Sequence, residues 1–422
     1  MPFEQGRPEH GGGPRRDEPV SRLPGFLASL GYRNFRLLWT GAFLSSIGTW
    51  TQDVALAWLI HTQLGNPVYL GLRTFASDAP LLAFMLVGGA VADRVDRRRI
   101  LLASQFLQMA FAATLGGLYA AGRLGLAPIL TIAFLTGLAQ SQSAPTYQAV
   151  ITSLVPKERI PNAVALNSLQ FNLSRAIGPA IAALLLARAG TGVCFAVNAA
   201  SFLAVIVALW RIELPAPALR PAGSLRESLA AGLRFALRDP TISALMALAA
   251  FSSFLAFPLV TYLPVVADTV LGTGVAGYSL LLSSFGGGAI VGAVVTAQRG
   301  NRSGRGRLLL AMMMCHGLTT IGALLSRTQS ASMALLFLSG VSLVSAFSTL
   351  NSLVQEQAPP ELRGRVVSIY GLAFRGGGPL GSLVAGFLVS AFGAVAVLGT
   401  FAGLLTLLAL ALRLRRGRLP SL

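Results

Sequence analysis

The sequence predicts an all-α membrane protein with twelve transmembrane helices arranged as two repeats of six. Three observations lead to this fold class. Of the 422 residues, 54% are apolar and 11% are charged, whereas soluble domains carry roughly 25% charged residues. The charged residues separate apolar runs of about 18 residues or more, which is long enough to cross a bilayer as a helix. Finally, short motifs of the first half return in the same order in the second half.

Polar or glycine-rich turns set the limits of the twelve predicted spans. In the first half the spans are residues 35–60, 68–92, 100–122, 127–154, 161–188 and 193–212. In the second half they are residues 241–267, 275–298, 308–326, 331–357, 363–391 and 394–412. The chain therefore divides into a disordered cytoplasmic tail (1–33), an N-terminal six-helix bundle (34–212), a cytoplasmic linker (213–240), a C-terminal six-helix bundle (241–413) and a second cytoplasmic tail (414–422).

The net charge of +18 comes mostly from arginine, since Lys157 is the one lysine among 33 basic residues. We place 27 of them in the termini and the even-numbered loops, three in the odd-numbered loops and three inside spans. By the positive-inside rule, this asymmetry predicts that both termini are cytoplasmic. The basic residues would contact anionic lipid rather than nucleic acid, and the expected location is a bacterial inner membrane.

The linker between the two halves is predicted to contain an amphipathic helix. Ser224 and Glu227 fit a capping box at its start. Leucines then recur every four residues while arginines lie off that row, as in a helix that rests on the membrane surface. Asp239 and Pro240 would end it.

Three motif pairs carry the internal repeat. The turn at residues 156–159 resembles the one at residues 359–363, and residues 99–103 resemble residues 307–311. The sequence Arg-Ala-Ile-Gly-Pro that begins at Arg175 matches Arg-Gly-Gly-Gly-Pro that begins at Arg375. A parallel repeat of six spans is known in transporters that hold substrate near the midplane between the halves.

The loop between spans two and three has the pattern G-x-x-x-D-R-x-x-R-R, formed by Gly89, Asp93, Arg94, Arg97 and Arg98. This pattern resembles the loop motif of the major facilitator superfamily of transporters, although the family usually has glycine where this chain has Asp96. With the repeat, the resemblance covers about residues 34–413. Within the superfamily, residues 49–52 and the turn at 156–159 look like the enterobactin-exporter and macrolide-efflux group.

The same loop is expected to act as an inner gate. At the end of span two, Asp93 could accept hydrogen bonds from the start of span eleven and pair with Arg363 or Arg365. Such a latch would favour the outward-open state and break once in each cycle.

Buried charges in the first two spans are candidates for proton coupling, because a charge at the bilayer centre costs at least ~2.5 kcal/mol on insertion scales. Asp53 lies on a polar face of span one with Ser45 and Thr49, and this face is expected to line a wet cavity. Arg73 could pair with Asp53 or with Asp78. The pair would either close the outer gate structurally or leave one carboxylate free to bind a proton.

The candidate substrate-binding residues are Gln52, Gln140, Arg175 and Arg375. The two arginines occupy matching positions of the repeat, so they could hold an anionic group from both sides of the cavity. Alternatively, each arginine hydrogen-bonds carbonyls that the following proline frees. His316 is more simply read as a packed, neutral histidine.

Together these features predict a secondary transporter that exports a small amphipathic or anionic organic molecule, of drug or siderophore type, in exchange for protons. This is the activity of antiporters that confer multidrug resistance. We find no phosphate-binding loop, metal cluster or catalytic set, so we expect that the protein is not an enzyme and needs no cofactor besides the proton gradient. We also expect a monomer. The alternatives are an importer or lipid transporter of the same fold and, further off, a receptor that does not transport.

Overall fold

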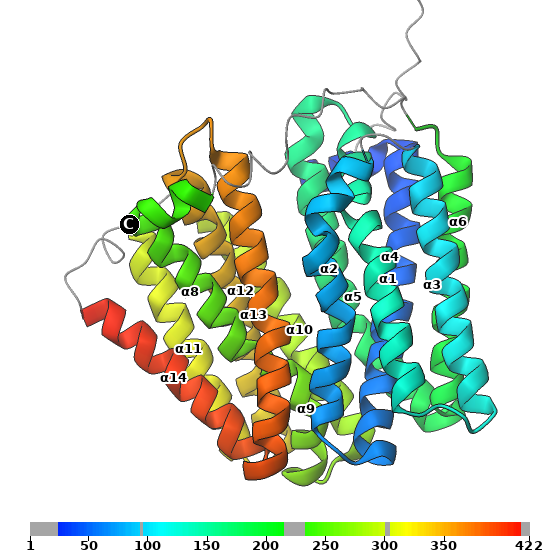
Figure 1. The fold of residues 1–422 in the computed structure, drawn as a ribbon, viewed down its shortest axis with the longest axis vertical. Coiled ribbons are helices and arrows are strands. Elements are labelled where there is room, and N and C mark those ends of the chain that lie inside the picture. The colour runs from blue at the N-terminus through cyan, green and yellow to red at the C-terminus, as the bar shows by residue number, and fades with distance from the viewer. Residues whose placement is uncertain (1–23, 93–95, 215–232, 300–303, 415–422) are drawn as a thin grey trace, which may run out of the picture.

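The computed structural model describes residues 24–92, 96–214, 233–299 and 304–414, which are helical nearly throughout. Figure 1 shows these helices as two groups that stand side by side. The first half consists of η1 (Gly25–Gly31), α1 (Arg33–Leu59), η2 (Ile60–Leu64), α2 (Val68–Ala92), α3 (Arg97–Ala120), α4 (Leu126–Ser153), η3 (Lys157–Arg159), α5 (Ile160–Ala189) and α6 (Thr191–Arg211). The second half consists of α8 (Pro240–Ala256), α9 (Pro258–Thr269), α10 (Gly274–Arg299), α11 (Arg305–Leu325), α12 (Gln329–Gln357), α13 (Arg363–Phe392) and α14 (Ala394–Leu414).

The predicted spans agree with these helices to within three residues at each end. One span, 241–267, is divided into α8 and α9 at Phe257. Pro258 has no N–H to donate to the carbonyl of Phe254, so the α-helical hydrogen bonding is interrupted there. Gly381 of α13 packs against that carbonyl, and a Cβ at Gly381 would lie 2.0 Å from the oxygen. The break between α8 and α9 is therefore filled by the backbone of α13 and does not leave a gap.

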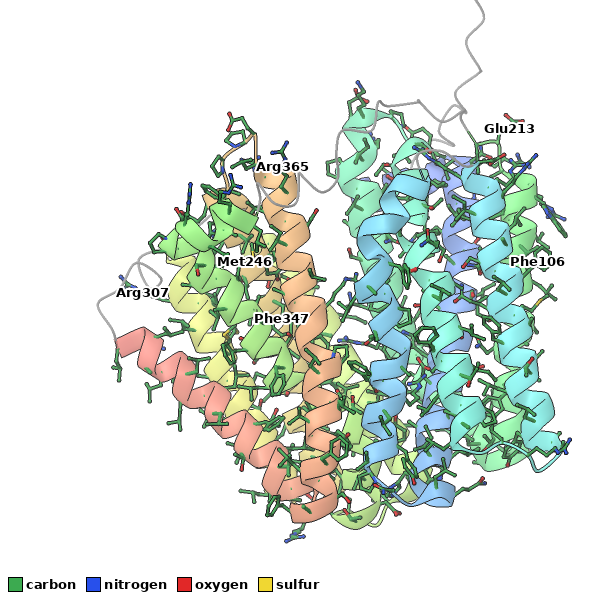
Figure 2. All side chains as sticks on the ribbon, viewed as in Figure 1. Phe106, Glu213, Met246, Arg307, Phe347 and Arg365 are labelled. Carbon is green, nitrogen blue, oxygen red and sulfur yellow. The ribbon has the colours of Figure 1, made fainter. Side chains whose placement is uncertain are left out.

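Several outward-facing side chains are suited to lipid. By length and composition, nine helical segments of the described ranges can cross a membrane, with α8 and α9 counted as one. Large apolar side chains stay exposed on the outer faces, among them Phe106 on α3, Trp210 on α6 and Leu407 on α14, and Figure 2 shows Phe106 pointing away from the bundle. An aqueous protein would not expose such a surface.

Packing within the two halves follows the same scheme. In the first half, α1 packs on α5 and α6, α2 on α4, and α3 on α4 and α6. In the second half the equivalent contacts are α8 with α13 and α14, α10 with α12, and α11 with α12 and α14. Each of these contacts of one half has its counterpart in the other, which confirms the predicted pair of six-helix repeats.

The ends of the bundle differ in how the halves meet. At the end with residues 65–67, 121–125 and 270–273, here named the closed end, a hydrophobic cluster joins the halves. It includes Leu59 and Leu70 of the first half and Leu259 and Val389 of the second. At the other end, named the open end, where α1 and α13 begin, each half has an apolar cluster of its own. Figure 1 shows α2 and α13 diverging toward the open end.

The predicted N-terminal tail needs a correction, because residues 25–31 are the 3-10 helix η1. The side chain of Asn162 on α5 accepts the Ser29 N–H at 2.9 Å and donates to the Phe26 carbonyl at 2.9 Å. Sequence patterns do not reveal such contacts between distant segments. Residues 1–23 and 415–422 lie outside the described ranges.

In the linker, residues 215–232 are likewise outside the described ranges, and so is the predicted capping box. Residues 233–238 are helical. Asp239 then caps α8, since its carboxylate accepts the N–H groups of Thr241 and Ile242 at 2.9 and 2.8 Å. Asp239 and Pro240 therefore separate the linker from the second bundle, as the sequence predicts.

Candidate functional site

A cavity of about 1070 Å³ lies between the halves at the open end. Its volume is near the upper limit of typical small-molecule pockets, ~300–1,000 Å³. One wall is α5 and the other is formed by α10, α11 and α12. Its polar lining consists of Asn162, Ser168, Asn172, Thr296, Gln298, Ser348, Thr349, Ser352, Arg305 and Glu356, and Phe26 lies at its rim.

Beyond the lining residues of the cavity, toward the middle of the molecule, α5 and α10 come into contact. A Cβ at Gly286 of α10 would lie 3.0 Å from the Arg175 carbonyl oxygen and 3.0 Å from the Ala176 Cα. Pro179 cannot donate a helical hydrogen bond to that carbonyl. Glycine at position 286 therefore lets α10 approach the irregular point of α5.

Polar and aromatic contacts connect the halves at the closed end. The Nε2 atom of His61 lies 3.0 Å from Oδ2 of Asp268, and the ring of Trp58 stacks on Tyr278 with centroids 6.3 Å apart. Gly71 of α2 lies against α13, because a Cβ there would be 2.5 Å from the Ser382 carbonyl oxygen. The cavity consequently faces the open end.

Four charged residues and one tyrosine form a cluster that includes groups of both halves. Arg73 and Asp53 make an ion pair between α2 and α1. Asp78 interacts electrostatically with Arg73 on its own helix and with Arg375 on α13. Tyr278 of α10 interacts with Asp53 and Arg73. Two carboxylates and two guanidinium groups balance one another, so the cluster is neutral when all four are ionised.

The arginines at matching positions of the repeat have different surroundings. The guanidinium of Arg175 lies over the Phe285 ring, 5.4 Å from its centroid. Its Nε and Nη2 atoms are buried and have no hydrogen-bond partner among the described residues. These two atoms therefore do not bond proline-freed carbonyls, which was one of the two predicted alternatives. Arg375 is exposed and has Asp78 nearby.

The polar face predicted on α1 does not line the cavity. Gln52 Oε1 accepts a hydrogen bond from Asn198 Nδ2 at 2.9 Å, and Thr49 lies 3.4 Å from Asn198 Oδ1. Asn198 of α6 offers these residues a polar partner inside the bundle, and the expectation of a wet cavity along this face stays a prediction. Gln140 similarly donates to Gln108 at 3.3 Å.

The structure describes part of the predicted gating motif. Gly89 lies near the end of α2, and Asp93 and Arg94 are outside the described ranges. Asp96, which replaces the usual glycine, caps α3 by accepting the Arg98 N–H at 2.8 Å. The Arg98 guanidinium donates to the Ile212 carbonyl.

Three other arginines complete what is seen of this region. Arg97 has a buried Nε without a partner among the described residues. Arg363 and Arg365 are exposed where α13 begins, and Arg365 is visible there in Figure 2. The proposed latch to Asp93 stays a prediction.

Sequence reasoning missed several residues of the cavity and of the closed end. Thr349, Ser352 and Glu356 of α12 line the cavity at steps of three and four, and this helical spacing could have identified them. His61 gave no such signal, because its partner is 207 residues away in the chain.

Two parallel repeats of six helices, with a cavity between them that faces one end, define a secondary transporter of the major facilitator fold. The outward-facing apolar side chains make it a multi-pass membrane protein. The chain belongs to the transmembrane secretion effector family, whose model matches residues 25–422. It is accordingly a transporter of small molecules rather than an enzyme, and the predicted resemblance is confirmed.

Relatives of known name agree with this family. The enterobactin exporter EntS of Shigella flexneri is 27% identical over 414 residues, which cover 91% of this chain and 93% of the relative. The staphyloferrin A transporter of Staphylococcus aureus (strain NCTC 8325 / PS 47) is 32% identical over 155 residues, or 36% of this chain and 38% of that relative.

Solved structures show the same fold. A bacterial homolog of the human lysosomal transporter Spinster, in an inward-facing and unoccupied conformation, has a TM-score of 0.70 at 16% identity and covers 90% of this chain and 95% of its own. The nucleoside transporter NupG has a TM-score of 0.73 at 12% identity and covers 90% and 98%.

Proposed function

We propose that this transporter exports a small amphipathic or anionic organic molecule of the siderophore type, in exchange for protons, across a bacterial inner membrane. The observation that carries the proposal is the position of the cavity. It faces the end that holds most of the described loop arginines, including Arg97, Arg159 and Arg363, while Arg123 and Arg327 lie at the closed end. If the basic end is cytoplasmic, the cavity is open to the side on which an exporter loads its substrate.

The names of two relatives support the substrate class. Enterobactin and staphyloferrin A appear in those names, and the polar lining with a neighbouring arginine suits a ligand with acidic groups. A volume of about 1070 Å³ accommodates a molecule larger than a single sugar or amino acid.

The charge cluster supports the coupling to protons. Protonation of Asp78 would leave it neutral beside Arg73 and Arg375 and weaken its attraction to α13. Because α13 belongs to the other half, loss of that attraction favours separation of the halves at the closed end. Asp78 would in this way couple its protonation to the arrangement of the two halves, and no cofactor besides the proton gradient is needed.

Flux in inside-out vesicles tests the proposal. With an acidic lumen, vesicles that contain the protein should accumulate a catecholate or a citrate-type siderophore, and a protonophore should abolish the accumulation. Glu158→Gln, which removes an exposed loop carboxylate, serves as the matched control for Asp53→Asn and Asp78→Asn. Accumulation in right-side-out vesicles instead would identify an importer, and gradient-independent flux would refute proton coupling.

A further inference from the structure

Arg175 presents an unused binding edge in the middle of the molecule. Its Nε and Nη2 atoms have no hydrogen-bond partner within the described ranges, and their N–H bonds point in parallel along one side of the guanidinium. This is the side that binds a carboxylate through two hydrogen bonds. Buried charged donors without partners are strongly unfavourable, so an anionic acceptor that reached this edge would relieve that cost.

This edge lies next to the cavity. On α5, Asn172 lines the cavity and Arg175 follows three residues later. On α10, Ile290 lines the cavity and Phe285, whose ring lies under the guanidinium, is five residues earlier. Arg175 is therefore about one helical turn, ~5.4 Å along the axis, beyond the lining residues. It is also near the centre of α5, where carriers of this architecture hold substrate.

Arg375, the matching arginine of the repeat, differs from Arg175 because an acidic residue lies near it. Arg375 interacts with Asp78 of α2. The offset between the motifs at Arg99 and Arg307 places Gly286 of α10 at the position that corresponds to Asp78, and the two residues before it are Ser284 and Phe285. At the corresponding positions the repeat thus supplies an acidic residue near Arg375 and no acidic residue near Arg175.

We propose that Arg175 alone binds the acidic group of the transported molecule, side-on through Nε and Nη2, with Phe285 beneath the guanidinium, while Arg375 is kept for Asp78. This inference rests on the proposed function, which supplies the premise that the transported molecule is an anion. It adds that the substrate carries at least one carboxylate or comparable acid, and that this acid points toward α5 rather than between two arginines.

Binding to the purified full-length protein in detergent tests this without any transport. The probes are dansylglycine and its neutral amide, which differ only in the acid, and the readout is the affinity of each by fluorescence titration. The wild type should prefer the acid by about tenfold or more. Arg175→Gln should weaken acid binding by roughly 10- to 100-fold, as expected for a charge-assisted hydrogen-bond pair, and leave amide binding unchanged.

Two further variants separate the roles. Arg175→Lys keeps the positive charge but lacks the two parallel N–H donors of the guanidinium, so it should retain part of the preference for the acid that Arg175→Gln loses. Arg375→Gln should keep the whole preference. The inference is overturned if Arg175→Gln retains the preference for the acid, if it loses both probes equally while its melting temperature is unchanged, if Arg375→Gln removes the preference, or if the wild type binds neither probe.

The outcome is distinguishable from that of the vesicle experiment. An acid preference that depends on Arg175, without proton-driven flux, would support this site and refute the exporter. Proton-driven flux of a siderophore, with a preference that does not depend on Arg175, would do the reverse.

Discussion

Asp53 and Asp78 lie close to the same arginine but have different structural roles. Asp53 forms its ion pair with Arg73 inside the first half, so this contact is independent of how the halves are arranged. Asp78 interacts with arginines of both halves. The sequence identified both carboxylates and the possible pairing, but spacing within two helices cannot tell which carboxylate also approaches a helix of the other repeat.

We therefore expect the two asparagine variants to fail differently. Asp78→Asn should still bind substrate and exchange it between the two sides, but the proton gradient should no longer drive accumulation. Asp53→Asn should remove the ion-pair partner of Arg73, leaving it the interaction with Asp78, and lower stability by about 1–3 kcal/mol. Counterflow and gradient-driven uptake in vesicles, together with thermal melting, separate these effects. Uncoupled exchange in Asp53→Asn with full coupling in Asp78→Asn would contradict the assignment.

At the scale of the helices, hydrophobic periods and turn residues were enough to predict the spans. Tertiary contacts decided the rest: η1 is fixed through a side chain of α5, and the polar face of α1 found its partner on α6. In both cases the partner is more than 100 residues away, and no local pattern connects such segments. Pro258 was a local signal for the break between α8 and α9, although the length of the apolar run concealed it.

The side chain of Asn162 makes hydrogen bonds that attach η1 to α5. Asn162→Ala removes the hydrogen bonds to Ser29 and Phe26, each worth about 1 kcal/mol. Hydrogen exchange of residues 25–32 should become roughly 5- to 30-fold faster, with the core of α5 unchanged, as measured by mass spectrometry. Asn351→Ala, on α12, is the control and should not affect this segment. Unchanged exchange in Asn162→Ala would show that η1 is held by its apolar contacts.

The contact between α2 and α13 at the closed end requires glycine. In Gly71→Ala the new Cβ would lie 2.5 Å from the Ser382 carbonyl oxygen and 2.6 Å from the Tyr262 hydroxyl, so α2 and α13 must move apart. We expect the closed end to open and the open end to narrow. Spin labels at Glu158 and Gln355, in a background without Cys194 and Cys315, should report a shorter distance.

Gly117→Ala provides the control for this experiment, since a Cβ at Gly117 has no neighbour within 4 Å. Its label distance should equal that of the unsubstituted protein. An unchanged distance in Gly71→Ala as well would mean that the contact yields locally without moving the halves.

At the scale of the whole molecule, the bridge between His61 and Asp268 joins the two halves at the end away from the cavity. The Asp268 side chain is 45% exposed, so the bridge contributes about 0–1 kcal/mol. That amount still changes the ratio of two states of similar free energy by up to about fivefold. His61→Ala and Asp268→Ala should each increase the population in which the closed end is open, and the double variant should not exceed the larger single effect. Distance distributions between the same labels test this, and additive effects would show that the residues act separately.

Because a hydrophobic cluster joins the halves at the closed end, the opening of this end is expected to have a heat-capacity change. Opening this end exposes apolar surface to water, and such exposure has a positive heat-capacity change. Apolar association weakens on cooling. Unless the open end buries an equal apolar area when it closes, lowering the temperature should move the carrier toward the form in which the closed end is open. The ratio of the two populations should then give a curved rather than a straight van't Hoff plot.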